Sequence, residues 1–339
     1  MISIQKRKQN WIEFYDLTGN VNRLLMINCS EIESQRPPFW WEKIPERTEW
    51  AYETYQKRVE SLEWLHDNTV PFLSMLTGTE IFAEAFGCSV HKPDDMPPFA
   101  LPLVFSVKDL HKVKFPKIED TKLSLLFDMA DKLKARAGKD AVLGLPDVQT
   151  PMDIAALIWE KVDFFSALYE EPEAVKELTL KIKLFMFDFF DEWFRRYGKE
   201  LSAHFPNYYM PFGITMSEDE VGVVSSDTYK EFFEKELHEF SERYGQIGIH
   251  CCANAKHQWE NFKNIPNLKL LNIGASESQQ YESASFFKDV CAQYPLWIET
   301  DISTIEDNDK IHFVTQINVD TKQEAIEAVT GFNNLIKKT

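Results

Sequence analysis

The sequence has few cysteines, no long apolar run and little positive charge. Its five cysteines are odd in number and scattered over 339 residues. That pattern fits a reducing compartment better than a disulfide framework. No apolar run reaches the roughly 18 residues that a helix needs to cross a bilayer. The basic start of the sequence also lacks the apolar core of a secretory signal. We therefore expect a cytoplasmic protein with no membrane partner.

The shortage of positive charge restricts the partners further. Lysine and arginine number 37 against 54 aspartates and glutamates, which gives a formal net charge of −17 at pH 7. Nucleic acids repel a protein of this charge, so we expect none as a partner. A small anionic ligand stays compatible, because a local basic pocket can form on an acidic protein. The glycine-rich motifs of nucleotide-binding folds and the Gly-x-Ser-x-Gly motif of serine hydrolases are also absent.

Hydrophobic residues make up 44% of the sequence, which is ample for a large core. From Pro71 onward, short apolar runs alternate with longer amphipathic helices, a pattern typical of a parallel α/β domain. We expect a (β/α)₈ barrel of the TIM type over residues 71–339, preceded by an N-terminal helical extension over residues 1–70. The expected strands include 141–146, 213–216, 246–251, 268–273, 296–300 and 312–319.

One expected helix has an apolar face that can be read from its spacing. The segment Pro172–Tyr197 begins with a proline, which suits the first turn of a helix. Leu180, Leu184, Phe187, Phe190 and Phe194 recur at helical spacing within it. We expect this stripe to face the core.

Polar residues follow several of the expected strands. Because parallel strands of a barrel place their carboxyl ends at one mouth, we expect these side chains to gather there. Acidic groups after strands are candidates for a direct role in catalysis, and a second set consists of candidate metal ligands. The catalytic candidates are Asp147, Glu218 and Asp219, and the metal candidates are His250, Cys252, Glu299 and Asp301.

The segment Ile247–Cys252 gives the most specific chemical signal. Side chains alternate along a strand, so His250 and Cys252 point to one side while Cys251 points to the other. An imidazole nitrogen and a thiolate on one face suit Zn²⁺. Two ligands do not complete a zinc site, and Glu299, Asp301 or Glu218 could supply the third. The same pattern also occurs where a buried cysteine packs in the core and a histidine bonds a neighbour.

Five segments have a recognisable order and spacing: Gly78–Cys88, Gly144–Asp147, Ser217–Glu220, Ser226–Phe232 and Ile249–Cys252. Together they resemble the uroporphyrinogen decarboxylase superfamily from about Pro71 to the end of the chain. The resemblance implies a (β/α)₈ barrel with an N-terminal helical extension.

The superfamily contains two chemistries, and the residues resemble one branch more than the other. Its true decarboxylases hold substrate carboxylates with arginines near the N-terminus. Here Arg36–Trp40 resembles the start of that motif, but Glu42–Pro45 stands where the arginine-rich part would follow. His250 and Cys252 instead match the His-x-Cys zinc motif of the cobamide-dependent methyltransferases. Two departures are Ala253 in place of a glycine and the lack of a cysteine near the C-terminus.

Three functions are compatible with these residues. The first is a zinc-dependent methyltransferase that moves a methyl group between a corrinoid, supplied by a partner protein, and a small substrate. The second is a decarboxylase of a carboxylated substrate, in which Asp147 or Asp219 orients the substrate and a basic patch lines the mouth. The third is a non-catalytic barrel that binds a corrinoid or another ligand.

Overall fold

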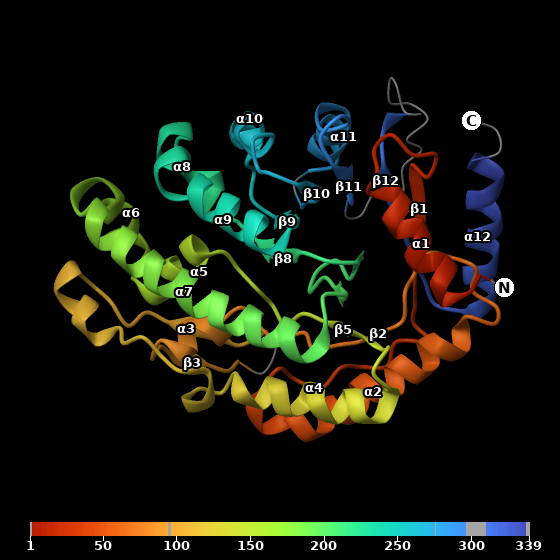
Figure 1. The fold of residues 1–339 in the computed structure, drawn as a ribbon, viewed down its shortest axis with the longest axis horizontal. Coiled ribbons are helices and arrows are strands. Elements are labelled where there is room, and N and C mark those ends of the chain that lie inside the picture. The colour runs from red at the N-terminus through yellow and green to blue at the C-terminus, as the bar shows by residue number, and fades with distance from the viewer. Residues whose placement is uncertain (1, 94–95, 275, 296–309, 337–339) are drawn as a thin grey trace.

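Parallel strands form the centre of the molecule, with helices around them (Figure 1). The computed structural model describes residues 2–93, 96–274, 276–295 and 310–336. One sheet has the order β1-β12-β11-β10-β9-β8 and a second has the order β2-β5-β6-β7. The strands of the first sheet are β1 (Arg23–Cys29), β12 (Phe313–Val319), β11 (Ala292–Gln293), β10 (Leu268–Ile273), β9 (Ile247–Cys251) and β8 (Ile214–Ser217). Those of the second are β2 (Phe72–Leu73), β5 (Val142–Gly144), β6 (Leu201–Ser202) and β7 (Tyr209–Met210).

The two sheets close into a TIM-type barrel. All strand pairs are parallel except the β6–β7 pair and a separate hairpin of β3 (Ser89–His91) and β4 (Phe99–Leu101). On one side, a parallel bridge joins Gln149, just after β5, to Ser217 of β8. On the other, Asn68 precedes β2, and its backbone N–H donates to the carbonyl of Leu25 in β1 at 2.8 Å. The expected (β/α)₈ architecture is therefore confirmed.

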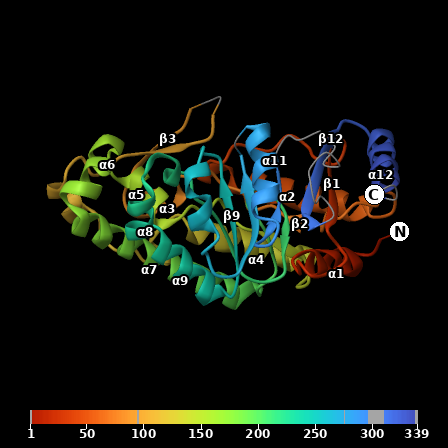
Figure 2. The ribbon, with the colours of Figure 1, turned by 90° about the horizontal axis from the view of Figure 1, so that it is seen from above.

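Helices follow the strands and cover the outside of the barrel (Figures 1 and 2). The longer ones are α2 (Ile44–Ser61), α4 (Ser124–Ala137), α7 (Pro172–Tyr197), α9 (Glu234–Tyr244) and α12 (Lys322–Ile336). The shorter ones are α3 (Ile81–Ala85), α5 (Pro151–Ile158), α6 (Lys161–Glu170), α8 (Ser226–Phe232), α10 (Trp259–Phe262) and α11 (Glu277–Phe286). Within the described residues, none of the helices is both long and apolar enough to span a membrane.

The apolar face of α7 differs in part from the expected one. Leu180 and Leu184 are 47% and 45% exposed, so this part of the predicted stripe is wrong. The helix instead buries a neighbouring face that includes Ile182, Phe185 and Phe189. Phenylalanine is common enough along α7 to offer apolar residues on more than one face, so spacing alone did not single out the buried one.

The first 70 residues contain a barrel strand as well as helices. Helices α1 (Ile4–Phe14) and α2 agree with the expected helical character, but β1 lies between them and pairs with β12 along its whole length. The segment is therefore not helical throughout. The run Leu24–Ile27 is buried on both faces, which suits an inner strand of a parallel barrel. The division of the chain at residue 70 stays a prediction, and the expected strand at 296–300 lies outside the described residues.

Helix α1 closes the amino-terminal end of the barrel. Trp11 and Phe14 are fully buried there. The indole of Trp11 donates to the carbonyl of Asn68 just before β2 (2.9 Å), and His312 Nδ1, just before β12, lies 2.7 Å from the carbonyl of Phe14. The hydroxyl of Tyr15 donates to the carbonyl of Tyr209 at 2.7 Å. The opposite, carboxyl-terminal end is therefore the one left for a site, as in other TIM barrels.

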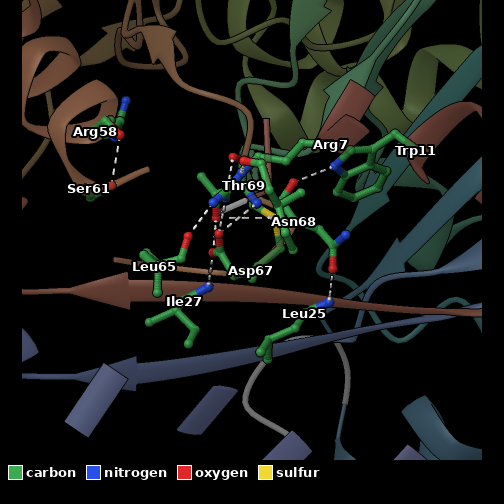
Figure 3. Close-up of polar contacts among 12 residues, drawn as sticks. Arg7, Trp11, Leu25, Ile27, Arg58, Ser61, Leu65, Asp67, Asn68 and Thr69 are labelled. Carbon is green, nitrogen blue, oxygen red and sulfur yellow. Dashed lines mark hydrogen bonds and ion pairs between the residues drawn. The ribbon is translucent and has the colours of Figure 1, made fainter. Parts of the chain in front are cut away.

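A buried ion pair fixes α1 to the strands (Figure 3). The guanidinium of Arg7 bonds the Asp67 carboxylate, the carbonyl of Leu65 and, at 2.9 Å, the carbonyl of Thr69. Asp67 also accepts the backbone N–H of Ile27 in β1 at 3.0 Å. Both side chains are almost completely buried. Burial raises the pKa of Asp67, and the nearby Arg7 opposes that rise.

Candidate metal centre

His250 lies near the end of strand β9, and Cys252 directly follows that strand, at the carboxyl-terminal mouth of the barrel. His250 is 9% exposed and lies in register with Ser217 of β8 and Asn272 of β10. The Phe205 ring packs against the imidazole edge to face, with 4.9 Å between ring centroids. Cys252 is exposed, whereas Cys251 is buried on the other side of the strand. The predicted alternation of these side chains is therefore present.

Asp219 joins His250 and Cys252 in one group. Its carboxylate accepts the backbone N–H of Cys252 at 2.7 Å, and its second oxygen lies 2.9 Å from the Cys252 sulfur. One donor atom from each of the three residues lies within 4.8 Å of the others. In the described part of the chain, no other group of three histidines, cysteines or acids has this geometry.

The donor set fits zinc. It offers an imidazole nitrogen, a thiol sulfur and a carboxylate oxygen, which are the usual protein ligands of Zn²⁺. Bonds of about 2.0–2.3 Å put two ligands of one ion at most about 4.6 Å apart, so a small side-chain shift would close the group around an ion. Three ligands leave a fourth position for a substrate. Without a metal, burial and the Asp219 carboxylate raise the pKa of the Cys252 thiol to about 12.

Of the acids predicted to supply the third ligand, Glu299 and Asp301 lie outside the described residues. Glu218 is 1% exposed and interacts with Asp153 and Thr150 of the β5–α5 segment. Burial, with Asp153 beside it, raises the pKa of Glu218 well above the ordinary range. Asp219, predicted for a direct catalytic role, is the acid that lies next to the thiol.

Asp153 supports the loop that carries Asp219. Its carboxylate accepts the backbone N–H groups of Asp219 (2.8 Å) and Glu220 (3.0 Å). Thr150 in turn caps helix α5 by accepting the backbone N–H of Asp153. Burial, opposed by these hydrogen bonds, raises the pKa of Asp153 to about 7. Sequence patterns gave no indication of this role, because Asp153 lies in the first turn of helix α5 and does not directly follow a strand.

Asp147 follows β5 at the same mouth, next to a histidine that sequence reasoning missed. His204 Nε2 is 2.9 Å from the Ser217 hydroxyl and 3.9 Å from Asp147 Oδ1. Burial, with Asp219 and Asp153 nearby, raises the pKa of Asp147 to about 7. Burial lowers the pKa of His204 to about 3, so this ring is neutral at pH 7. His204 follows the two-residue strand β6, which is too short to show as a periodic pattern.

A hollow of about 550 Å³ opens at the same end of the barrel, beside the last residues of β1 and β12. Asn207 reaches it from the loop that carries Phe205. Among the described residues that line it, none is lysine or arginine. The polar side chains around it are those of Asn28, Ser30, Glu33, Asn207, Asn318, Asp320 and Glu324.

Comparisons with known proteins agree with this barrel fold. Residues 59–293 match the family described as uroporphyrinogen decarboxylase (URO-D). This chain belongs to the uroporphyrinogen decarboxylase family. Among solved structures, a methyltransferase from Methanosarcina mazei superimposes with a TM-score of 0.65 over 98% of each chain, at 10% sequence identity. That likeness extends the shared fold to the segment before residue 59. No curated protein sequence gives a significant match.

Membership of the family confirms the resemblance inferred from the sequence. It also agrees with the barrel fold that the resemblance implied.

Proposed function

We propose that this protein is a zinc-dependent methyltransferase that moves a methyl group between a corrinoid and a small substrate. The observation that carries the proposal is the group of Asp219, His250 and Cys252 at the barrel mouth. These three residues would hold the ion. Bound there, zinc would act as a Lewis acid that lowers the pKa of a thiol substrate at its open position.

The protein's own residues would prepare this site. The carboxylate of Asp219 contacts both the backbone N–H and the sulfur of Cys252, and so holds the thiol next to itself. Phe205 packs against the His250 ring and would restrain its orientation. A corrinoid carried by a partner protein would approach the carboxyl-terminal mouth, because α1 closes the other end of the barrel.

The charges at the mouth weigh against decarboxylation of a carboxylated substrate. Such an enzyme needs arginines or lysines to hold carboxylates. The hollow has amides and carboxylates instead. Arg47, on α2, is buried, and its guanidinium donates to the carbonyls of Phe39 and Leu76. A non-catalytic barrel stays an alternative and would bind its ligand stoichiometrically without turnover.

Metal analysis of purified protein tests the proposal. We expect about one zinc per chain after dialysis, and transfer of methyl from methylcobalamin to a small thiol. Cys252→Ser and Asp219→Asn should each lower zinc content and abolish transfer, because each removes one of three ligands. Cys251→Ala, next in sequence but on the opposite side of β9, should keep both.

Two results would contradict the proposal. One is a folded wild-type protein that takes up no zinc when the ion is supplied. The other is a Cys252→Ser variant that binds zinc as tightly as Cys251→Ala.

A further inference from the structure

Asn272 lies beside His250 in the middle of the sheet. It belongs to β10, is fully buried and is the register partner of His250. Its amide oxygen contacts His250 Nδ1, and its amide nitrogen donates to the backbone carbonyl of Tyr294, just after β11. One side chain therefore connects three neighbouring strands at the mouth.

The chemistry of these contacts fixes which way the amide points. The carbonyl of Tyr294 can only accept a hydrogen bond, so the atom of Asn272 that faces it must be the NH₂ group. The reversed amide would place two oxygens against each other. The Asn272 oxygen is therefore the atom that meets His250.

The same reasoning sets the proton on His250. An amide oxygen accepts and cannot donate, so His250 Nδ1 must carry the hydrogen in this contact. The neutral ring then has its lone pair on Nε2.

The Tyr294 carbonyl is itself held in place. The backbone N–H of Tyr294 donates to the carbonyl of Leu271 at 3.1 Å, and the Tyr294 hydroxyl donates to Gln316 Oε1 at 2.7 Å. On another side of the imidazole, Phe205 packs against the ring. The ring of His250 is thus restrained on two sides before any ion arrives.

We propose that Asn272 is a positioning residue of the metal centre: through the Tyr294 carbonyl it presets His250 to offer Nε2 as the metal ligand. This rests on the proposed zinc site and adds to it a residue that contacts neither the ion nor the substrate. Groups that hold the second nitrogen of a ligating histidine commonly contribute 10–100-fold in metal affinity.

Zinc affinity of four proteins tests the proposal, by competition with a chromophoric chelator at pH 7.5. Asn272→Leu removes the acceptor and should weaken zinc binding by about 10–100-fold. Asn272→Asp keeps an oxygen for Nδ1–H and should bind more tightly than Asn272→Leu. Gln293→Leu is the matched control, because it also removes a buried amide, from the adjacent strand β11. The amide of Gln293 contacts Ser283 and Cys291 and does not contact His250. This variant should bind zinc like the wild type.

A second measurement separates positioning from simple damage to the fold. The ¹⁵N resonances of His250 in metal-free wild-type protein should report the Nδ1–H tautomer, and Asn272→Leu should shift the ring toward a mixture. A wild-type ring protonated at Nε2, or an Asn272→Leu variant that binds zinc as tightly as Gln293→Leu, would overturn the proposal. A wild type that binds no zinc would instead refute the zinc site, while the tautomer result still decides the role of Asn272.

Discussion

Arg7 and Asp67 show how much one pair of residues contributes to this barrel. Their ion pair is almost inaccessible to water and connects helix α1 to the segment before β2. Removing one partner of such a pair leaves the other buried without compensation.

We expect Arg7→Met to lower the free energy of unfolding by about 3–5 kcal/mol, because it leaves the Asp67 carboxylate unpaired. Adding Asp67→Asn to the same protein should recover part of this loss, since the charge is then gone. Urea unfolding at pH 7 measures both. Equal stability of the single and double variants would show that the ion pair is not the source of the effect.

At the residue scale, strand alternation was enough to predict from the sequence that the side chains of His250 and Cys252 lie together. Their role as metal ligands stays a prediction. The sequence was not sufficient to choose among the acids. Glu218 and Asp219 are adjacent, and only the packing of β8 against Asp153 decides that Glu218 is buried. His204 and Asn272 reach the mouth through tertiary contacts that no local pattern encodes.

At the element scale, helices α7 and α9 pack with a buried acid between them. Glu236 on α9 lies beside Thr179 and Lys183 of α7, and Lys183 also pairs with Glu239 at 2.6 Å. Burial raises the pKa of Glu236 to about 8, and Lys183 opposes the rise only in part.

The pH dependence of Glu236 follows from the direction of this shift. Between the unfolded pKa, about 4.3, and the folded pKa, the unfolded chain has lost a proton that the folded protein keeps. Stability from this group therefore falls as pH rises through that window. Glu236→Gln cannot ionise, so it should lose less stability than the wild type between pH 6 and pH 9, by on the order of 2 kcal/mol. Urea midpoints at the two pH values test this. A parallel loss in both proteins would contradict it.

Elements with strong periodicity were predictable and short ones were not. Apolar runs in the sequence predicted the strands β8, β9, β10 and β12. Amphipathic spacing predicted helices between such runs. The strands β2, β6 and β11 have two residues each, too few for any alternation to appear. The exposed Leu180 and Leu184 show a further limit, since an apolar residue at helical spacing can still face water.

At the scale of the whole molecule, the two ends of the barrel have separate tasks. Helix α1 stabilises the amino end, and the candidate metal centre lies at the carboxyl end. Changes at one end should therefore leave the other largely unaffected.

Two neighbouring positions on α1 test this separation. Trp11 is fully buried and Ile12 is 45% exposed. Trp11→Ala should lower the free energy of unfolding by about 3–5 kcal/mol, because it removes a large buried side chain. Ile12→Ala should change it by only about 0.5 kcal/mol. Zinc affinity of the folded proteins should match the wild type in both. A large loss of zinc affinity in Trp11→Ala, with the protein still folded, would show that the ends are coupled.

The pairing of β1 with β12 also determines when the barrel can close during synthesis. Asn28 and Asn318 are 290 positions apart yet hydrogen-bonded to each other. At about 5–20 residues per second, a ribosome needs roughly 15–60 s to make the chain between them. During that time β1 has an unpaired edge, the feature by which nascent chains aggregate. The barrel can therefore close only after β12 has been synthesised.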